Sequence, residues 1–168
     1  MGSFLALFGY RNRVHNGFFC YLCTMTTMSP LDKARLIDLP KICDPRGNLS
    51  FVEGGRHLPF NIRRVFYIYD VPGGETRGGH AHRKCSIMLV AAAGSLTVRL
   101  TDGKDEKTFL LNRSNRGLLI PPGVWDTMED FTTGTVVLAL ASHQYEEEDY
   151  IRDFDEFCEY AAANRSEQ

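Results

Sequence analysis

The sequence lacks any hydrophobic run close to the roughly 18 apolar residues that a membrane-spanning helix requires. It also lacks a basic surplus, because 19 lysine and arginine residues stand against 21 aspartate and glutamate residues. Without excess positive charge, a protein has little with which to displace counterions from a nucleic-acid backbone. We therefore expect neither a membrane protein nor a nucleic-acid-binding protein.

Features of a secreted protein are also missing. The apolar segment 3–8 has no basic residue before it and no small-residue cleavage pattern after it, so it does not resemble a signal peptide. The five cysteines form an odd and scattered set, and the Cys20-x-x-Cys23 pair has no second pair at zinc-binding spacing. This cysteine usage favours a reducing, cytoplasmic location and predicts no metal or redox role for the thiols.

The first 24 residues differ in composition from the rest of the chain. They contain six aromatic residues and no acidic residue, and the first acidic residue of the chain is Asp32. Met25 and Met28 are each a possible start of a shorter protein. We interpret residues 1–24 as an N-terminal extension outside the fold, and residues 25–168 as a single domain of ordinary size.

From about Leu36 onward, short extended runs alternate with glycine, proline and asparagine turn signals. The runs are 49–53, 62–70, 86–93, 95–101, 107–111, 117–120 and 134–141. Such a succession predicts an all-β sandwich or small barrel. Over 148–162 the apolar residues recur every three or four positions, which predicts one amphipathic C-terminal helix with an acidic first turn at 146–149.

The segment 74–94 carries the most informative pattern. Alternate side chains of a strand share a face, so His80 and His82 should point into one cavity, followed by Lys84 if the strand continues. Gly74, His80, His82 and Gly94 resemble the first cupin motif. Two imidazoles in one cavity can bind a metal ion or transfer protons.

A second cupin motif is echoed by the segment 121–126, where Asp126 stands in place of the usual histidine. The expected glutamate of the first motif is also missing, because Ser86 and Ile87 occupy the candidate positions. A facial triad of His80, His82 and Asp126 remains one interpretation. Metal-free histidines that move protons are the other.

Five segments, in chain order, resemble the dTDP-sugar 3,4-ketoisomerase family, and the likeness covers about residues 36–160. The segments are 44–49, 64–70, 77–84, 117–125 and 148–152. The resemblance implies an all-β cupin, a jelly-roll-like barrel with a C-terminal helix, that forms a homodimer. It implies an isomerase that converts dTDP-4-keto-6-deoxy-glucose into the 3-keto isomer without a metal or other cofactor.

Moving a carbonyl from C4 to C3 requires a base that takes the C3 proton and returns a proton to C4. Histidine suits this role because its ordinary pKa is near 6.5. We assign His82 as the base and His80 as the partner that handles the oxygen proton, although the residues alone leave this division open. Tyr67 is the predicted phenol donor to the developing oxyanion, and Tyr69 shares its strand face.

The diphosphate of a sugar nucleotide needs cationic partners. Arg77 and Lys84 flank the histidines and are the predicted phosphate ligands. Trp125 is predicted to stack on the sugar or on thymine, although packing in the core explains it equally well.

Two other functions remain open at this point. One is a cupin that binds sugar nucleotides without turnover, and the other is a metal-dependent enzyme that uses His80, His82 and Asp126. Related cupin epimerases use a histidine–aspartate dyad, and the sequence predicts no such dyad here.

Overall fold

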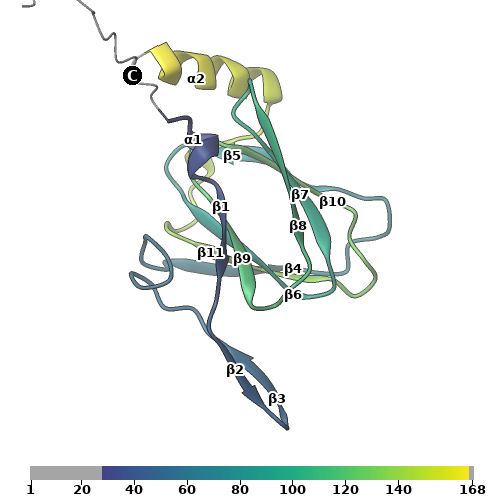
Figure 1. Ribbon diagram of the computed structural model, residues 1–168. Helices are drawn as coiled ribbons and strands as arrows, with labels where there is room; N and C mark the ends of the chain where they lie inside the picture. The colour runs from purple at the N-terminus through teal and green to yellow at the C-terminus, as the bar shows by residue number, and fades with distance from the viewer. Residues whose placement is uncertain (1–27, 167–168) are drawn as a thin grey trace, which may run out of the picture.

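The computed structural model describes residues 28–166, which form two five-stranded sheets, a projecting hairpin and a C-terminal helix (Figure 1). The first sheet has the order β1 (Arg35–Asp38), β9 (Arg116–Ile120), β6 (Ile87–Ala93), β11 (Val136–Ala141), β4 (Arg64–Ile68). The second has the order β12 (Tyr150–Ile151), β5 (Arg77–His82), β10 (Trp125–Glu129), β7 (Leu96–Thr101), β8 (Glu106–Leu111). All neighbouring strands in both sheets are antiparallel. The predicted all-β cupin fold is confirmed.

The main core lies between the two sheets and explains why these segments form strands. In β7 the residues Leu96, Val98 and Leu100 are fully buried and alternate with more exposed polar residues. They pack with buried residues of the other sheet such as Leu89 and Val137. Each buried aliphatic side chain of this kind contributes about 1.5–3 kcal/mol to folding, so the alternating pattern fixes which face of each strand points inward.

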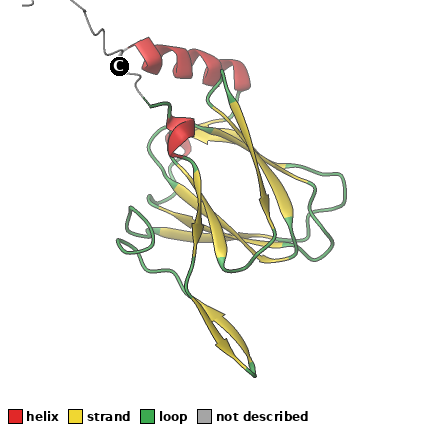
Figure 2. Ribbon diagram, in the orientation of Figure 1, coloured by secondary structure: helices red, strands yellow, loops and turns green. Residues whose placement is uncertain are grey.

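The C-terminal helix starts later than the sequence predicts. Residues Glu147–Asp149 form a 3₁₀ turn, η1, and α2 spans Phe154–Ser166 (Figure 2). The helix begins there because the side chain of Asp153 accepts a hydrogen bond from the Glu156 N–H at 2.9 Å, as a helix cap does. The acidic run 146–149 is therefore not the first turn of the helix, which corrects the prediction.

Between η1 and α2 the chain forms the short strand β12. Tyr150 pairs with His82 and Ile151 pairs with Ala81 of β5. The helix α2 then packs Phe157 onto the outer face of this sheet, against Ala81 and Ile151. The apolar side of the predicted amphipathic helix thus covers the outer face of the sheet. Tyr150 belongs to the sheet rather than to the helix.

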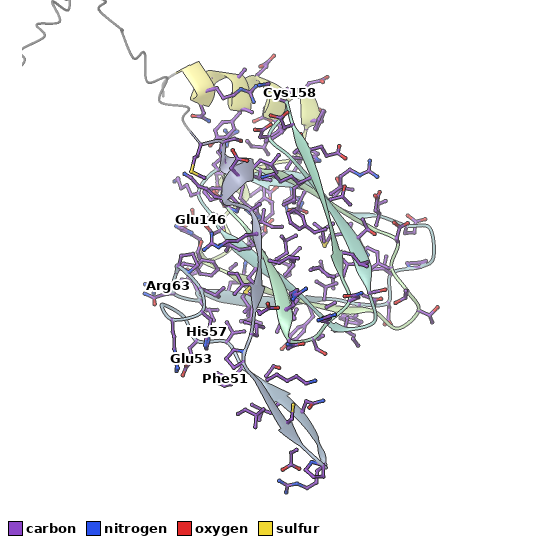
Figure 3. All side chains as sticks on the ribbon, viewed as in Figure 1. Phe51, Glu53, His57, Arg63, Glu146 and Cys158 are labelled. Atoms are coloured by element: carbon purple, nitrogen blue, oxygen red, sulfur yellow. The ribbon has the colours of Figure 1, made fainter. Side chains whose placement is uncertain are left out.

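A hairpin projects from the body of the molecule (Figure 1). It consists of β2 (Lys41–Asp44) and β3 (Gly47–Ser50), and all eight strand residues are exposed. The following segment folds back on itself, because the Glu53 N–H donates to His57 Nδ1 at 3.0 Å and the rings of Phe51 and His57 pack edge to face (Figure 3). Farther along this segment, Leu58 covers part of the outer face of the first sheet.

The short helix α1 (Pro30–Lys33) begins at Ser29, whose hydroxyl caps it and also hydrogen-bonds Asp102. Neither helix in the described part of the chain is long and apolar enough to cross a membrane. The predicted extension at 1–24 lies outside the described residues, so its interpretation remains a prediction.

Candidate active site

The antiparallel register of β12, β5 and β10 brings four polar side chains onto one face of the second sheet. Asp126 is the cross-strand partner of His80, and Tyr150 is the partner of His82. Directly opposed residues in an antiparallel pair point to the same side. The imidazole rings of His80 and His82 lie edge to face with 5.2 Å between centroids, and the Tyr150 ring lies 5.1 Å from His80 and 4.3 Å from His82. The predicted pairing of the two histidines is thus present in the geometry.

A buried aspartate orients His82. The Nδ1 atom of His82 lies 2.9 Å from Oδ2 of Asp149. The carboxylate also accepts backbone N–H groups of Lys84 at 2.6 Å and Cys85 at 3.3 Å, in the turn that follows β5. An acceptor at Nδ1 places the ring proton there and leaves Nε2 with its lone pair free. The structure therefore contains a histidine–aspartate dyad that the sequence analysis did not predict.

Burial and charge set the protonation states of this dyad. Burial lowers the pKa of His82 to about 4, with the charges of His80 and Arg64 acting in the same direction and Asp149 opposing them. Burial by itself would raise the pKa of Asp149, but the hydrogen bonds from His82 and the backbone hold it below its usual value. At neutral pH the pair is thus a neutral imidazole beside a carboxylate. His82 Nε2 is buried and has no hydrogen-bond partner among the described residues.

A second carboxylate lies beside His80. Oδ2 of Asp126 is 3.9 Å from Nε2 of His80. Burial raises the pKa of Asp126, and a positive charge on His80 would oppose that shift. The side chain of His80 is 17% exposed, whereas that of His82 is 5% exposed. His80 is therefore the histidine of the pair that keeps more contact with solvent.

The backbone of β5 approaches Asp126 closely at Gly78. This glycine has φ +79°, and a Cβ atom built there would lie 2.3 Å from Oδ1 of Asp126. Only glycine fits both the left-handed backbone and the space beside the carboxylate. Gly78 thus sets how closely β5 can approach the Asp126 side chain.

The opposite sheet contributes a cation to the same site. Arg64 of β4 donates from Nη2 to the hydroxyl oxygen of Tyr150 at 3.2 Å. Its guanidinium lies over the rings of Phe66 and Tyr145, at 5.2 Å and 5.5 Å from their centroids. The Nε atom of Arg64 is buried without a partner among the described residues.

Several predicted site residues lie elsewhere. Tyr67 alternates with the less exposed Phe66 and Ile68 of β4, and Tyr69 follows directly after the strand. The two tyrosines are 63% and 62% exposed. They line a shallow outer pocket of about 270 Å³ together with exposed Arg77. Tyr67 therefore does not face His80 and His82, because strand alternation turns it to the other side of β4.

Trp125 lies on the outer face of the second sheet. It neighbours Asp126 in the chain but points the opposite way, and its ring packs against Phe154 at 5.1 Å and Phe157 at 5.4 Å. This contact buries Trp125 beneath α2, away from the face that carries the histidines. Lys84 follows the end of β5 and is exposed, so it does not continue the histidine face.

One group of potential metal ligands occurs among the described residues. Ligand atoms of His82, Cys85 and Asp149 lie within 4.8 Å of one another, and all three residues are buried. Each already has a hydrogen-bond partner, since His82 bonds Asp149 and the Cys85 thiol donates to the Ser86 carbonyl at 3.4 Å. This group differs from the triad of His80, His82 and Asp126 considered from the sequence.

The sequence analysis predicted no role in the site for Asp149, Tyr150 or Arg64. All three lie within segments that resemble the ketoisomerase family, and this is the one signal by which they could have been found. The helical spacing of 148–162 concealed the short β12 strand and the inward direction of Tyr150.

Comparisons with known proteins identify the family. The family model described as FdtA, WxcM-like, C-terminal, matches residues 32–162. The chain is 43% identical over 128 residues to the TDP-4-oxo-6-deoxy-alpha-D-glucose-3,4-oxoisomerase of Aneurinibacillus thermoaerophilus, a match that covers 76% of this chain and 92% of that protein.

Solved structures agree with this match. A histidine-to-asparagine variant of the 3,4-ketoisomerase QdtA from Thermoanaerobacterium thermosaccharolyticum, in complex with TDP-4-keto-6-deoxyglucose, superimposes with a TM-score of 0.76 at 42% identity, over 77% of this chain and 94% of that one. The TDP-quinovose 3,4-ketoisomerase WlaRB of Campylobacter jejuni gives a TM-score of 0.72 at 38% identity, over 76% of this chain and 98% of that one. The chain thus belongs to the FdtA-like family of sugar-nucleotide 3,4-ketoisomerases, and its predicted membership is confirmed.

Proposed function

We propose that this chain converts dTDP-4-keto-6-deoxy-glucose into the 3-keto isomer by histidine acid–base catalysis, without a metal ion. The family membership supports the reaction class, and two of the relatives are named for, or were crystallised with, the corresponding TDP-4-keto sugar. The observation that carries the mechanism is the pair of adjacent imidazoles, each with a carboxylate beside it. The reaction moves hydrogen between neighbouring atoms and leaves the total oxidation state unchanged, so an acid–base pair is sufficient for it.

The different burial of the two histidines favours His80 as the group that meets the sugar. Its side chain keeps 17% exposure, so substrate from solvent can reach it, whereas His82 Nε2 is buried. Burial also lowers the pKa of His82 to about 4, which makes it a weak base. His80 then takes the C3 proton and returns a proton to C4, and the neutral His82 ring packs against it edge to face. This proposal moves the base from His82, to which the sequence analysis assigned it, to His80.

Binding of the nucleotide is proposed to involve Arg77 and Tyr69. Arg77 precedes His80 by three residues on β5, about 10 Å along a strand. With the sugar ring at His80, the diphosphate attached to it can reach Arg77. The guanidinium fork suits phosphate oxygens, and Tyr69 lines the same outer pocket. Replacing Arg77 with glutamine should weaken TDP binding by at least about tenfold in calorimetry, and an unchanged Kd would remove Arg77 from the binding site.

The reaction itself can be tested by NMR in deuterium oxide. The purified protein is mixed with dTDP-4-keto-6-deoxy-glucose, with and without EDTA. Formation of the 3-keto sugar in both tubes, with deuterium at C4, supports a metal-free base that exchanges its proton with solvent. Binding without turnover in either tube would favour a non-catalytic sugar-nucleotide-binding protein, and turnover lost only with EDTA would favour the metal-dependent alternative.

We also propose a homodimer. The projecting β2–β3 hairpin exposes Ile42 and Leu49, which are cross-strand partners and each 55% exposed. The groove beside the hairpin has a volume of about 900 Å³ and an apolar floor that includes Val90 and Leu138. A second copy of the chain that buried the hairpin would remove this exposed apolar surface and protect the nearby sheet edge.

Sedimentation of the wild-type protein and of Ile42→Asp tests the dimer. The wild type should sediment as a dimer and the variant as a monomer, with Lys104→Asp, at an exposed residue outside the hairpin, as a control. A monomeric wild type would contradict the proposal.

The cytoplasmic location also remains a proposal, supported by the free thiols of Cys43, Cys85 and Cys158.

A further inference from the structure

We propose that Tyr150, held by Arg64, is the catalytic residue that transfers the proton between the two sugar oxygens. This inference rests on the proposed isomerase function and extends it to the oxygen side of the reaction. Tyr150 faces both histidines, with its ring 4.3 Å from His82 and 5.1 Å from His80. Tyr67, the phenol predicted from the sequence, faces away from them. Tyr150 therefore takes the role first expected of Tyr67.

The hydroxyl of Tyr150 has a cationic partner. Arg64 Nη2 donates to its oxygen at 3.2 Å, so the phenol proton is free to be donated elsewhere. The other guanidinium beside the ring, that of Arg152, lies 4.4 Å from the ring centroid, but it is paired with Glu147 through two hydrogen bonds of 2.7 Å and 3.1 Å. Of these two cations, Arg64 is thus the one whose charge can stabilise a negative charge on the Tyr150 oxygen.

Arg64 has no carboxylate partner among the described residues. Its Nε atom is buried and unpaired, and its charge is one cause of the lowered His82 pKa, so it acts within the site. A half-buried cation without a counterion is costly unless an anion forms beside it. A phenolate on Tyr150, formed during turnover, would be such an anion.

The chemistry requires a relay of this kind. When the C3–H bond breaks, its electron pair forms the C3=C4 bond, and the carbonyl electrons move to O4, which takes the proton of Tyr150. The phenolate, stabilised by Arg64, then takes the proton from O3. The C3=O3 bond forms, and the C3=C4 electrons take the proton that His80 returns to C4. Tyr150 and His80 end in their starting states, and no oxidant or reductant is consumed.

The test compares Tyr150→Phe with Tyr145→Phe. Tyr145 packs beside Tyr150 with 5.4 Å between ring centroids, but its hydroxyl bonds Glu147. We expect Tyr150→Phe to lower kcat by at least about 100-fold, as for other positioned acid–base groups. TDP affinity and melting temperature should stay close to the wild-type values. Tyr145→Phe should keep kcat within about threefold.

The outcomes separate the relay from the overall function. If the wild type turns over the keto sugar and Tyr150→Phe stays within about threefold of it, the relay is wrong while the proposed function stands. If the wild type itself is inactive, the proposed function fails first. If Tyr150→Phe does not fold, 3-fluorotyrosine introduced at position 150 replaces it as the test. A more acidic phenol should move the basic limb of the kcat profile to lower pH, and an unmoved limb would overturn the relay.

Discussion

The carboxylate of Asp149 holds Nδ1 of His82 at 2.9 Å and also accepts two backbone N–H groups from the turn that follows the histidine. One buried side chain thus fixes both the ring and the chain that carries it. Asp149→Asn places an NH₂ group where at least one of these three donors now points. We expect a loss of about 2 kcal/mol in the free energy of unfolding, because a buried hydrogen bond to a charged group is lost.

Activity should fall by about 10- to 100-fold in the same variant, since the His82 ring loses its fixed tautomer. Glu148→Gln is the matched control, because it makes the same chemical change at the preceding, exposed residue. Urea unfolding and kcat measurements on both proteins check this. If the two variants had the same free energy of unfolding and the same kcat, the Asp149 carboxylate would not be needed to orient His82.

Stability should depend on pH through His82. Its pKa is about 4 in the folded protein against 6.5 for an ordinary histidine. Between these values the unfolded chain binds more protons, so the free energy of unfolding should decrease as pH falls from about 6.5 toward 4. The full contribution is on the order of 3 kcal/mol.

The His82→Asn variant isolates this contribution. Asp126 acts in the opposite direction, because burial raises its pKa, but it is present in both proteins. Urea titrations at pH 7 and pH 4.5 should show a smaller decrease for the variant than for the wild type. An identical decrease in both would exclude His82 as the source.

Gly78→Ala tests the close approach of β5 to Asp126. The new Cβ would meet the Asp126 carboxylate and would also sit on a backbone with φ +79°. Gly79→Ala is the control, because Gly79 has φ +68° and no atom within 4 Å of its Cβ position. We expect Gly79→Ala to cost about 1–2 kcal/mol from the left-handed backbone alone.

Gly78→Ala should cost at least about 1 kcal/mol more than Gly79→Ala and should also impair turnover, because the Asp126 side chain must move. Thermal melting and kcat for both variants provide the comparison. If both variants lost the same stability, the space beside Asp126 could accommodate the added methyl group without a further loss of stability.

Trp125→Leu separates packing from ligand binding. Its ring contacts Phe154 and Phe157 of α2, so the variant should lose about 1–3 kcal/mol of stability. TDP affinity should remain within about twofold of the wild-type value. A Kd weakened by tenfold or more, without a loss of stability, would instead support the sequence-based expectation that Trp125 stacks on the ligand.

The sequence was sufficient for the all-β fold and for the shared direction of His80 and His82, because both depend on local alternation along a strand. It was insufficient for Asp149 and Tyr150, because Asp149 bonds His82 across 67 positions of the chain and Tyr150 lies in a two-residue strand that pairs with β5. It also misplaced Tyr67, since the face of β4 that points inward is decided by packing against the other sheet. The places and directions of these side chains depend on the pairing of strands that are distant in the sequence and on burial, rather than on the local sequence pattern.

The most direct measurement of the central claim is turnover of dTDP-4-keto-6-deoxy-glucose by the wild type, His80→Asn and His82→Asn, with TDP binding measured on each. We predict that His80→Asn binds TDP normally and loses at least about 1,000-fold in kcat, while His82→Asn retains more activity. Wild-type turnover by His80→Asn would contradict the account.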